Sequence, residues 1–254
     1  MAGILLSGCN GKMGKAVTLN AAATDGCKVV GGIDVFAQQL SDYPVFASPS
    51  LVSKDIIEKT DCIIDFSNPS ALAGLLEFAV ANSLPAVIAT TGLNDAQINM
   101  IKNAAERIPV FFSANMSLGV NLVCELAKKA ASVLGNSFDI EIVEMHHNQK
   151  LDAPSGTALM IADSVKEELE NDVKYEYDRH SKREKRSKNE IGIHSVRGGT
   201  ITGEHEIIFA GHDEIIKISH SARSKELFAT GAINAALFIS GKPAGLYNMS
   251  DMLR

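Results

Sequence analysis

The first 115 residues of the chain alternate short, continuous apolar runs with stretches of helical periodicity. Strands buried in a parallel sheet are apolar along their length, because helices cover both faces of the sheet. Parallel strands also require a long crossover, which a helix of about 10–15 residues supplies. The pattern predicts an α/β fold with a Rossmann-like, doubly wound parallel sheet. Strands are expected at residues 4–7, 28–33, 61–66, 86–89 and 110–113, and helices at 12–23, 70–81 and about 94–106.

The pattern changes after residue 115, which predicts a second domain of the α+β class. The turn signal Gly211-His212-Asp213 indicates a hairpin there. The last helical segment is amphipathic and can pack back on the first half. We therefore expect one domain of residues 1–115 plus 226–254 and another of residues 116–225. Helices are expected at 120–134, 154–169 and 226–239, a strand at 139–147, and antiparallel strands at 191–197, 206–210 and 214–219.

Charge and composition exclude several classes of protein. A net charge of −6 and a pI near 5.7 argue against a broad nucleic-acid-binding surface. Residues 166–190 carry equal numbers of acidic and basic side chains, which favours a solvated loop or an excursion lining an oligomer over a basic patch. No apolar run reaches about 18 residues, and the N-terminus lacks the features of a signal peptide. We expect a cytoplasmic protein with no membrane span.

The four cysteines, Cys9, Cys27, Cys62 and Cys124, are far apart and form no CxxC pair. This spacing excludes a zinc ribbon, and a disulfide framework is not expected in a chain of this length. Most of them stand among Val, Ile and Ala, so buried free thiols are expected.

A first ligand-binding motif is the sequence GCNGKMG at residues 8–14, after the first predicted strand and at the start of a predicted helix. Glycines at such a turn let the backbone approach a pyrophosphate, whose charge meets the free N–H groups of the helix. The spacing is GxxGxxG rather than GxGxxG, so a glycine-rich turn without a ligand is the alternative. Asp34 follows Gly14 by 20 residues, where a carboxylate would hold a ribose hydroxyl. These features favour a dinucleotide site, with the turns at 90–92 and 113–116 lining its nicotinamide end.

The densest polar segment is EIVEMHHNQKLDAPSGTA at residues 141–158. His146 and His147 leave a predicted strand, Lys150 follows in a loop, and the sequence PSGT opens a helix. A histidine can move a proton near neutral pH, and a helix start binds carboxylates or phosphates. A metal site is the weaker alternative, because neighbours on a strand point to opposite faces and no third ligand cluster is evident. The serine and threonine alone could be helix caps, and no GxSxG nucleophile elbow occurs.

This segment resembles the signature of the 4-hydroxy-tetrahydrodipicolinate reductases, also called dihydrodipicolinate reductases, of the diaminopimelate route to lysine. The resemblance covers essentially the whole chain and rests on collinear motifs, which makes it specific. Besides residues 141–158 and the glycine loop, it includes TTG at 90–92, SANMSLGVN at 113–121, IGIHSVRGG at 191–199 and GLYNMSD at 245–251.

The resemblance implies an oxidoreductase that reduces a small dicarboxylate with NADH, NADPH or both, and without a metal. It implies a cofactor domain closed by the last helix and a substrate domain that forms a homotetramer. His146 would be the catalytic proton donor, and Lys150 a second donor or charge stabiliser. The substrate would be bound by His147, Ser155, Gly156 and Thr157, and the cofactor would be contacted by Gly8, Cys9, Asn10, Gly11, Lys12, Met13, Asp34, Ala89, Thr90, Thr91, Ser113, Ala114, Asn115 and Met116.

Three positions depart from residues that are common in the family. Lys12 stands where Arg is common and Ala89 where Gly is common, and both changes are tolerable. Val35 stands where some members have Arg after the ribose acid, which favours use of NADH at least as readily as NADPH. Two rival functions are another NAD(P)-dependent dehydrogenase of a small carboxylic acid and a non-catalytic nucleotide sensor. A sensor would need no proton donors beside an anion site.

Overall fold

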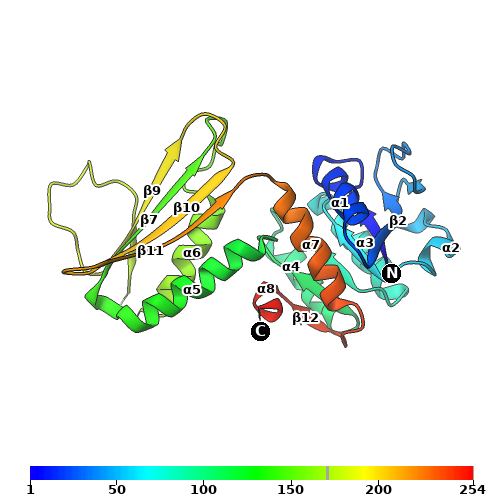
Figure 1. The fold of residues 1–254 in the computed structure, drawn as a ribbon. Helices are drawn as coiled ribbons and strands as arrows, with labels where there is room; N and C mark the ends of the chain where they lie inside the picture. Colours follow the sequence, from blue (N-terminus) through cyan, green and yellow to red (C-terminus); the bar gives the residue numbers. More distant parts are fainter. Residues whose placement is uncertain (170–171, 254) are drawn as a thin grey trace. The chain divides into compact units, whose positions relative to one another are not determined.

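The structure is a computed structural model that describes residues 1–169 and 172–253 (Figure 1). The chain divides into two compact units. Unit 1 comprises residues 1–117 and the described chain from residue 225 onward, and unit 2 comprises the described residues between 118 and 224.

Unit 1 is built on a seven-stranded sheet in which every pair of neighbours is parallel. Its strands are β1 (Ala2–Ser7), β2 (Cys27–Ile33), β3 (Val45–Phe46), β4 (Cys62–Asp65), β5 (Ala86–Ile88), β6 (Pro109–Phe112) and β12 (Gly245–Tyr247). They are ordered β12-β6-β5-β4-β1-β2-β3, so the order reverses between β1 and β4. Open α/β sheets bind ligands outside the carboxyl ends of their strands at such a point. The expected strands are present, while β3 and β12 were not expected because two or three residues carry no periodicity.

Helices cover both faces of this sheet, as the doubly wound class requires. Leu6 of β1 belongs to a buried cluster with Ile233, whereas its neighbour Leu5 belongs to a second cluster with Leu75 and Ile101. Successive residues of a strand point to opposite faces, so each face has its own core. The helices of unit 1 are α1 (Lys12–Ala23), α2 (Lys54–Ile57), α3 (Leu72–Ala81), α4 (Asp95–Ala105), α7 (Glu226–Ile239) and α8 (Met249–Met252), with 3-10 turns at Pro49–Leu51 and Pro69–Ala71.

Unit 2 has a mixed sheet with helices α5 and α6 packed on one face (Figure 1). Alternate residues of its central strand, β7, are buried, and Ile140 and Ile142 pack with Val123 and Ile161 of the two helices. The α+β class expected for this region is confirmed. The strands, ordered β11-β10-β7-β9-β8, are β7 (Asp139–His146), β8 (Lys174–Glu176), β9 (Glu190–Arg197), β10 (Gly203–Ala210) and β11 (Ile215–Ala222), and the helices are α5 (Leu118–Leu134) and α6 (Gly156–Lys166), with a 3-10 turn at Gly135–Ser137.

One strand direction in unit 2 was wrongly expected. The predicted hairpin exists, since β10 and β11 pair in antiparallel fashion. Strand β9, however, is parallel to both β7 and β8 rather than antiparallel. The chain passes from β7 through helix α6 to β8, and then through residues 177–189 to β9. Connections of about a dozen residues or more allow the following strand to run in the same direction. A short apolar run in the sequence does not show whether the strand will be parallel or antiparallel to its neighbours.

Most described residues of the charged segment at 166–190 are exposed, as expected for a solvated loop. It also contains β8, and Arg179 and Arg186 contact Glu141 on β7. The Arg186 side chain is only 18% exposed. Its guanidinium donates to Glu141 Oε1 at 2.9 Å, to Asp139 Oδ1 at 3.0 Å and to the Ile140 carbonyl at 3.1 Å. The numbers of acidic and basic residues in a segment do not show which of them form ion pairs with other segments of the fold. Residues 170–171 of this segment lie outside the described residues.

Two further expectations can be compared with the structure. The cysteines are all buried and free, as expected, and burial raises the pKa of both Cys9 and Cys124 to about 11. Within residues 1–169 and 172–253, no helix is long and apolar enough to cross a membrane.

Candidate active site

The glycine loop, residues 8–14, has no room for a side chain at two of its positions, Gly8 and Gly14. Gly8 has φ +78°, and a Cβ there would lie 2.5 Å from the Phe66 carbonyl oxygen. A Cβ at Gly14 would lie 2.2 Å from the Gly8 carbonyl oxygen. Helix α1 starts directly after Gly11, and no side chain caps its N-terminus. The loop therefore brings backbone close to the start of a helix whose N–H groups can face a phosphate.

Asp34 is joined to this loop by hydrogen bonds. Its Oδ2 accepts the Asn10 backbone N–H at 3.0 Å, and its Oδ1 accepts the Phe36 N–H at 3.0 Å. The Asn10 side-chain amide donates to the carbonyls of Phe36 at 2.7 Å and Gln38 at 3.0 Å. The acid after β2 and the loop after β1 therefore form one connected edge, which is the arrangement that a dinucleotide needs.

A buried aspartate at the end of β4 organises the neighbouring loops. Asp65 is 0% exposed. Its carboxylate accepts the Thr90 hydroxyl at 2.7 Å and the Ser67 hydroxyl at 2.5 Å. Sequence reasoning missed Asp65, although an acid at the end of a predicted apolar strand was a usable signal. Thr90, predicted to touch the cofactor, therefore uses its hydroxyl within the protein.

The remaining predicted cofactor residues follow β5 and β6, at the same edge of the parallel sheet. Asn115 Oδ1 accepts the Ser117 N–H at 2.9 Å, just before α5 begins. Cys9 and Met116 are 2% and 3% exposed and belong to the hydrophobic core. These two residues can meet a ligand mainly through backbone atoms. The predicted cofactor residues at this edge are Lys12 and Met13 at the start of α1 and, in the loops, Gly8, Cys9, Asn10, Gly11, Asp34, Ala89, Thr90, Thr91, Ser113, Ala114, Asn115 and Met116.

In unit 2, the predicted proton donor lies beside a carboxylate that the sequence reasoning did not single out. His146 is the last residue of β7, and its Nδ1 lies 2.6 Å from Glu144 Oε2. Glu144 is 0% exposed. Arg197, at the end of β9, donates to both oxygens of that carboxylate, at 2.9 Å to Oε2 and 2.7 Å to Oε1. The alternation of β7 places Glu144 and His146 on the same buried side.

The pKa values of this pair are shifted by burial and by their partners. Burial opposes ionisation of Glu144, but hydrogen bonds from Arg197, Ser195 and His146 outweigh it and lower its pKa to about 2. Burial lowers the pKa of His146, and the hydrogen bond to Glu144 only partly offsets this. The site at neutral pH is therefore an ionised carboxylate against an imidazole that titrates below its ordinary range.

The start of helix α6 adjoins this pair. Ser155 is the N-cap residue, and its Oγ accepts the Ala158 N–H at 3.1 Å. Its own N–H donates to Glu144 Oε1 at 3.2 Å. Its Oγ also lies 3.0 Å from Nε2 of the buried His205. The predicted substrate residue Ser155 thus has its polar atoms engaged within unit 2, whereas Gly156, which follows it, is exposed.

Lys150 and His147 lie in the loop between β7 and α6. The Lys150 ammonium is 2.9 Å from Asp152 Oδ1, and its backbone N–H donates to the His147 carbonyl at 3.1 Å. The structure therefore brings His146, His147, Lys150 and the α6 start, including Gly156 and Thr157, into one region of unit 2. Sequence reasoning missed three polar residues here. Glu144 and Arg197 lie inside motifs that it used, and His205 directly precedes a predicted strand.

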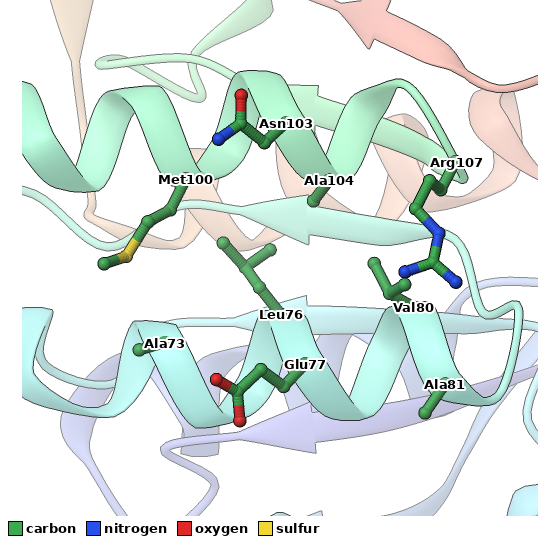
Figure 2. Close-up of a pocket in the computed structure, with 9 residues that line it drawn as sticks. All are labelled: Ala73, Leu76, Glu77, Val80, Ala81, Met100, Asn103, Ala104 and Arg107. Atoms are coloured by element: carbon green, nitrogen blue, oxygen red, sulfur yellow. The ribbon is translucent and has the colours of Figure 1, made fainter.

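A surface groove elsewhere in unit 1 contains none of these residues. It lies between α3 and α4, and Figure 2 shows Leu76 pointing from one helix toward the other. Glu77 and Arg107 are the charged residues of its lining. In the described part of the chain, no group of three or more His, Cys, Asp or Glu side chains is arranged to hold a metal ion.

Comparison with known proteins extends over the full length of the chain. Residues 2–116 match the family described as dihydrodipicolinate reductase, N-terminus, and residues 119–253 match its C-terminus. The 4-hydroxy-tetrahydrodipicolinate reductase of Caldanaerobacter subterraneus subsp. tengcongensis is 49% identical over 251 residues, covering 99% of this chain and 98% of the relative. The enzyme of the same name from Clostridium tetani is 45% identical over 253 residues, covering 100% and 97%.

A solved structure supports the same relationship. The dipicolinate-bound dihydrodipicolinate reductase from Paenisporosarcina sp. TG-14 is 25% identical, with a TM-score of 0.80, and the match covers 98% of this chain and 97% of that one. The resemblance stated from the sequence motifs is thereby confirmed. This chain belongs to the dihydrodipicolinate reductase family.

Proposed function

We propose that this protein reduces 4-hydroxy-tetrahydrodipicolinate to tetrahydrodipicolinate with NADH or NADPH, releasing water, in the diaminopimelate route to lysine. The observation that carries this proposal is the full-length match to reductases of that name, at 49% and 45% identity. The Glu144–His146 pair beside the α6 start is consistent with the chemistry, because it combines a proton carrier with a site for an anion.

Unit 1 fits a nicotinamide dinucleotide. The pyrophosphate would lie on the glycine loop, where Gly8 and Gly14 leave no room for side chains. Asp34 would accept the hydrogen of a ribose hydroxyl. The loops after β5 and β6 (residues 89–91 and 113–116) would face the nicotinamide half. When bound, the cofactor supplies the hydride.

Unit 2 supplies groups for a small dicarboxylate. The solved relative is described as dipicolinate-bound, and dipicolinate is a planar ring with two carboxylates. Gly156 and Thr157 at the α6 start would donate to one carboxylate, and His147 and Lys150 would face the anion. Ser155 would act by capping the helix and keeping those donors in place.

Side chains of the protein supply the proton that the reduction requires. The substrate hydroxyl leaves as water and gives a conjugated imine, which accepts hydride at a ring carbon. His146 donates a proton to the atom where the negative charge collects, and Lys150 stabilises that charge or provides a second proton. The balance is one hydride and one proton gained and one water lost.

We also propose that the protein is a cytoplasmic homotetramer assembled through unit 2. Support comes from β11, which is an edge strand of its sheet and exposes Ile215 at 63%. Unprotected edges with apolar side chains favour self-association. Light scattering coupled to size-exclusion chromatography tests this, and a monomeric mass at micromolar concentration would contradict it.

The experiment for the proposed function is an assay that follows the absorbance of the reduced cofactor. Substrate is generated by an upstream enzyme, and plain 2-oxo acids serve as controls. We expect oxidation of the cofactor only with the cyclic substrate. Turnover of the 2-oxo acids instead would indicate a different dehydrogenase, and cofactor binding without turnover of any substrate would indicate a sensor.

A further inference from the structure

We propose that Glu144, held by Arg197, is a positioning residue that fixes the orientation and the tautomer of His146. The inference deepens the proposed function, because it takes His146 as the residue that transfers the proton. It assigns a role to Glu144 and Arg197, two charged residues that were not among the predicted catalytic and binding residues.

The first observation is that the Glu144 carboxylate is completely enclosed and fully used. Its Oε2 contacts His146 Nδ1 at 2.6 Å and Arg197 Nη1 at 2.9 Å. Its Oε1 accepts Arg197 Nη2 at 2.7 Å and the Ser155 N–H at 3.2 Å. One carboxylate of β7 thereby connects β9, the start of α6 and the imidazole, which leaves it little freedom to move.

The second observation concerns the proton on the imidazole. An ionised carboxylate can only accept hydrogen bonds, so His146 Nδ1 must be the donor in this contact. The neutral ring then carries its hydrogen on Nδ1 and its lone pair on Nε2. Nε2 is directed to the side of Gly203, where a Cβ would come within 3.1 Å of it. The atom that exchanges a proton with substrate is therefore Nε2.

The third observation is that both terminal nitrogens of Arg197 donate within the protein, while its Nε is buried without a partner among the described residues. Besides its paired bonds to Glu144, it donates to the carbonyls of Asp152 at 2.6 Å and Val196 at 2.8 Å. An uncompensated buried carboxylate would be strongly unfavourable. We assign Arg197 the role of keeping Glu144 ionised, not that of binding a substrate carboxylate.

Several polar groups surround His146, and three charged ones act on its pKa. Glu144 raises it, while Lys150 and Arg197 lower it. The ring of His205 on β10 lies 5.3 Å from that of His146, centroid to centroid. The Asp152 carboxylate forms an ion pair with the Lys150 ammonium. Removing only the negative charge of Glu144 leaves the cations unopposed, so the pKa of His146 must fall.

The test compares E144Q with E141Q, both on β7. Glu141 is a matched control, since it also contacts arginines and a histidine (Arg179, Arg186 and His194) but not His146. We expect E144Q to lower kcat by about 10²-fold, within the range for a general acid, and to change KM by less than about threefold. An amide can present its NH₂ to Nδ1 and so favour the wrong tautomer.

The pH profile separates positioning from a merely structural effect. If protonated His146 is the active form, kcat falls as the pH rises through its pKa. In E144Q this alkaline limb should move down by about one pH unit or more, whereas E141Q should leave it in place. An E144Q enzyme with kcat within about threefold of wild type and an unmoved limb would overturn the proposal.

Two further measurements complete the test, and the second of them does not depend on the stability of E144Q. In a double-mutant cycle, E144Q combined with H146Q should be no slower than H146Q alone, because the two residues act as a unit; a further multiplicative loss would contradict the proposal. Nitrogen NMR of the wild-type protein should show that the neutral His146 ring is protonated on Nδ1. The His146 signals are identified by their absence from the spectrum of H146Q. An Nε2-protonated ring would overturn the proposal even if the proposed reductase activity itself were absent.

Discussion

Asp34 Oδ2 accepts the backbone N–H of Asn10 at 3.0 Å, which fixes the acid after β2 against the glycine loop. A carboxylate held there suits a ribose 2′-hydroxyl and repels the extra phosphate of NADPH. No arginine follows it, because residue 35 is valine, and Lys12 offers only a point charge. We predict that kcat/KM with NADH is at least equal to that with NADPH. A preference for NADPH above about tenfold, or about 1.4 kcal/mol, at one moderate salt concentration would contradict this placement.

His146→Gln removes the proton donor while keeping a polar side chain of similar reach. We predict that kcat falls by about 10²–10⁴-fold, with a much smaller change in KM. Steady-state kinetics with saturating cofactor provides the measurement. A variant with nearly normal kcat would remove His146 from the mechanism.

Thr157→Val tests the anion site at the start of α6. The change deletes one hydroxyl and leaves the backbone N–H groups, so KM for the substrate should rise while kcat changes little. Pyridine-2,6-dicarboxylate should compete with substrate at the same site. Absence of competition at millimolar concentrations would refute the assignment of this helix start to the substrate.

Gly8→Ala tests whether the close approach in the glycine loop matters. Gly26 is the matched control, because it also has positive φ, at +92° against +78°, but a Cβ there meets nothing within 4 Å. Both changes carry a left-handed backbone cost of about 1–2 kcal/mol. Only Gly8→Ala adds a clash, so it should lose more stability and weaken cofactor binding. Thermal melts measure the loss of stability, and cofactor titrations measure the loss of affinity. Equal effects of the two changes would contradict the proposal that the close backbone approach at Gly8 matters for cofactor binding.

The depressed pKa of Glu144 predicts how stability depends on pH. The pKa of an unfolded Glu is about 4.3, whereas burial and the opposing bonds from Arg197 leave the folded pKa at about 2. The stabilisation is therefore present above about pH 4.3 and is lost as the pH falls toward 2. Urea unfolding at a series of pH values should show a smaller loss over this window in Glu144→Gln than in wild type. Identical slopes would mean that Glu144 is not ionised in the folded protein.

The sequence allowed the parallel sheet, the glycine loop, Asp34 and the His146 segment to be predicted, because each leaves a local pattern. The features that escaped prediction depend on pairing between distant segments. Asp65 and Arg197 become significant only when β4 meets its neighbouring loops and β9 lies beside β7. The direction of β9 escaped for the same reason.

The fate of the hydride tests the proposed reductase activity most directly. The protein is supplied with enzymatically made 4-hydroxy-tetrahydrodipicolinate and NADH deuterated at its transferable position, and the product is analysed by mass spectrometry and NMR. We predict that the product is tetrahydrodipicolinate with one deuterium on a ring carbon and without the hydroxyl. A product that lacks deuterium, or that retains the hydroxyl, would contradict it.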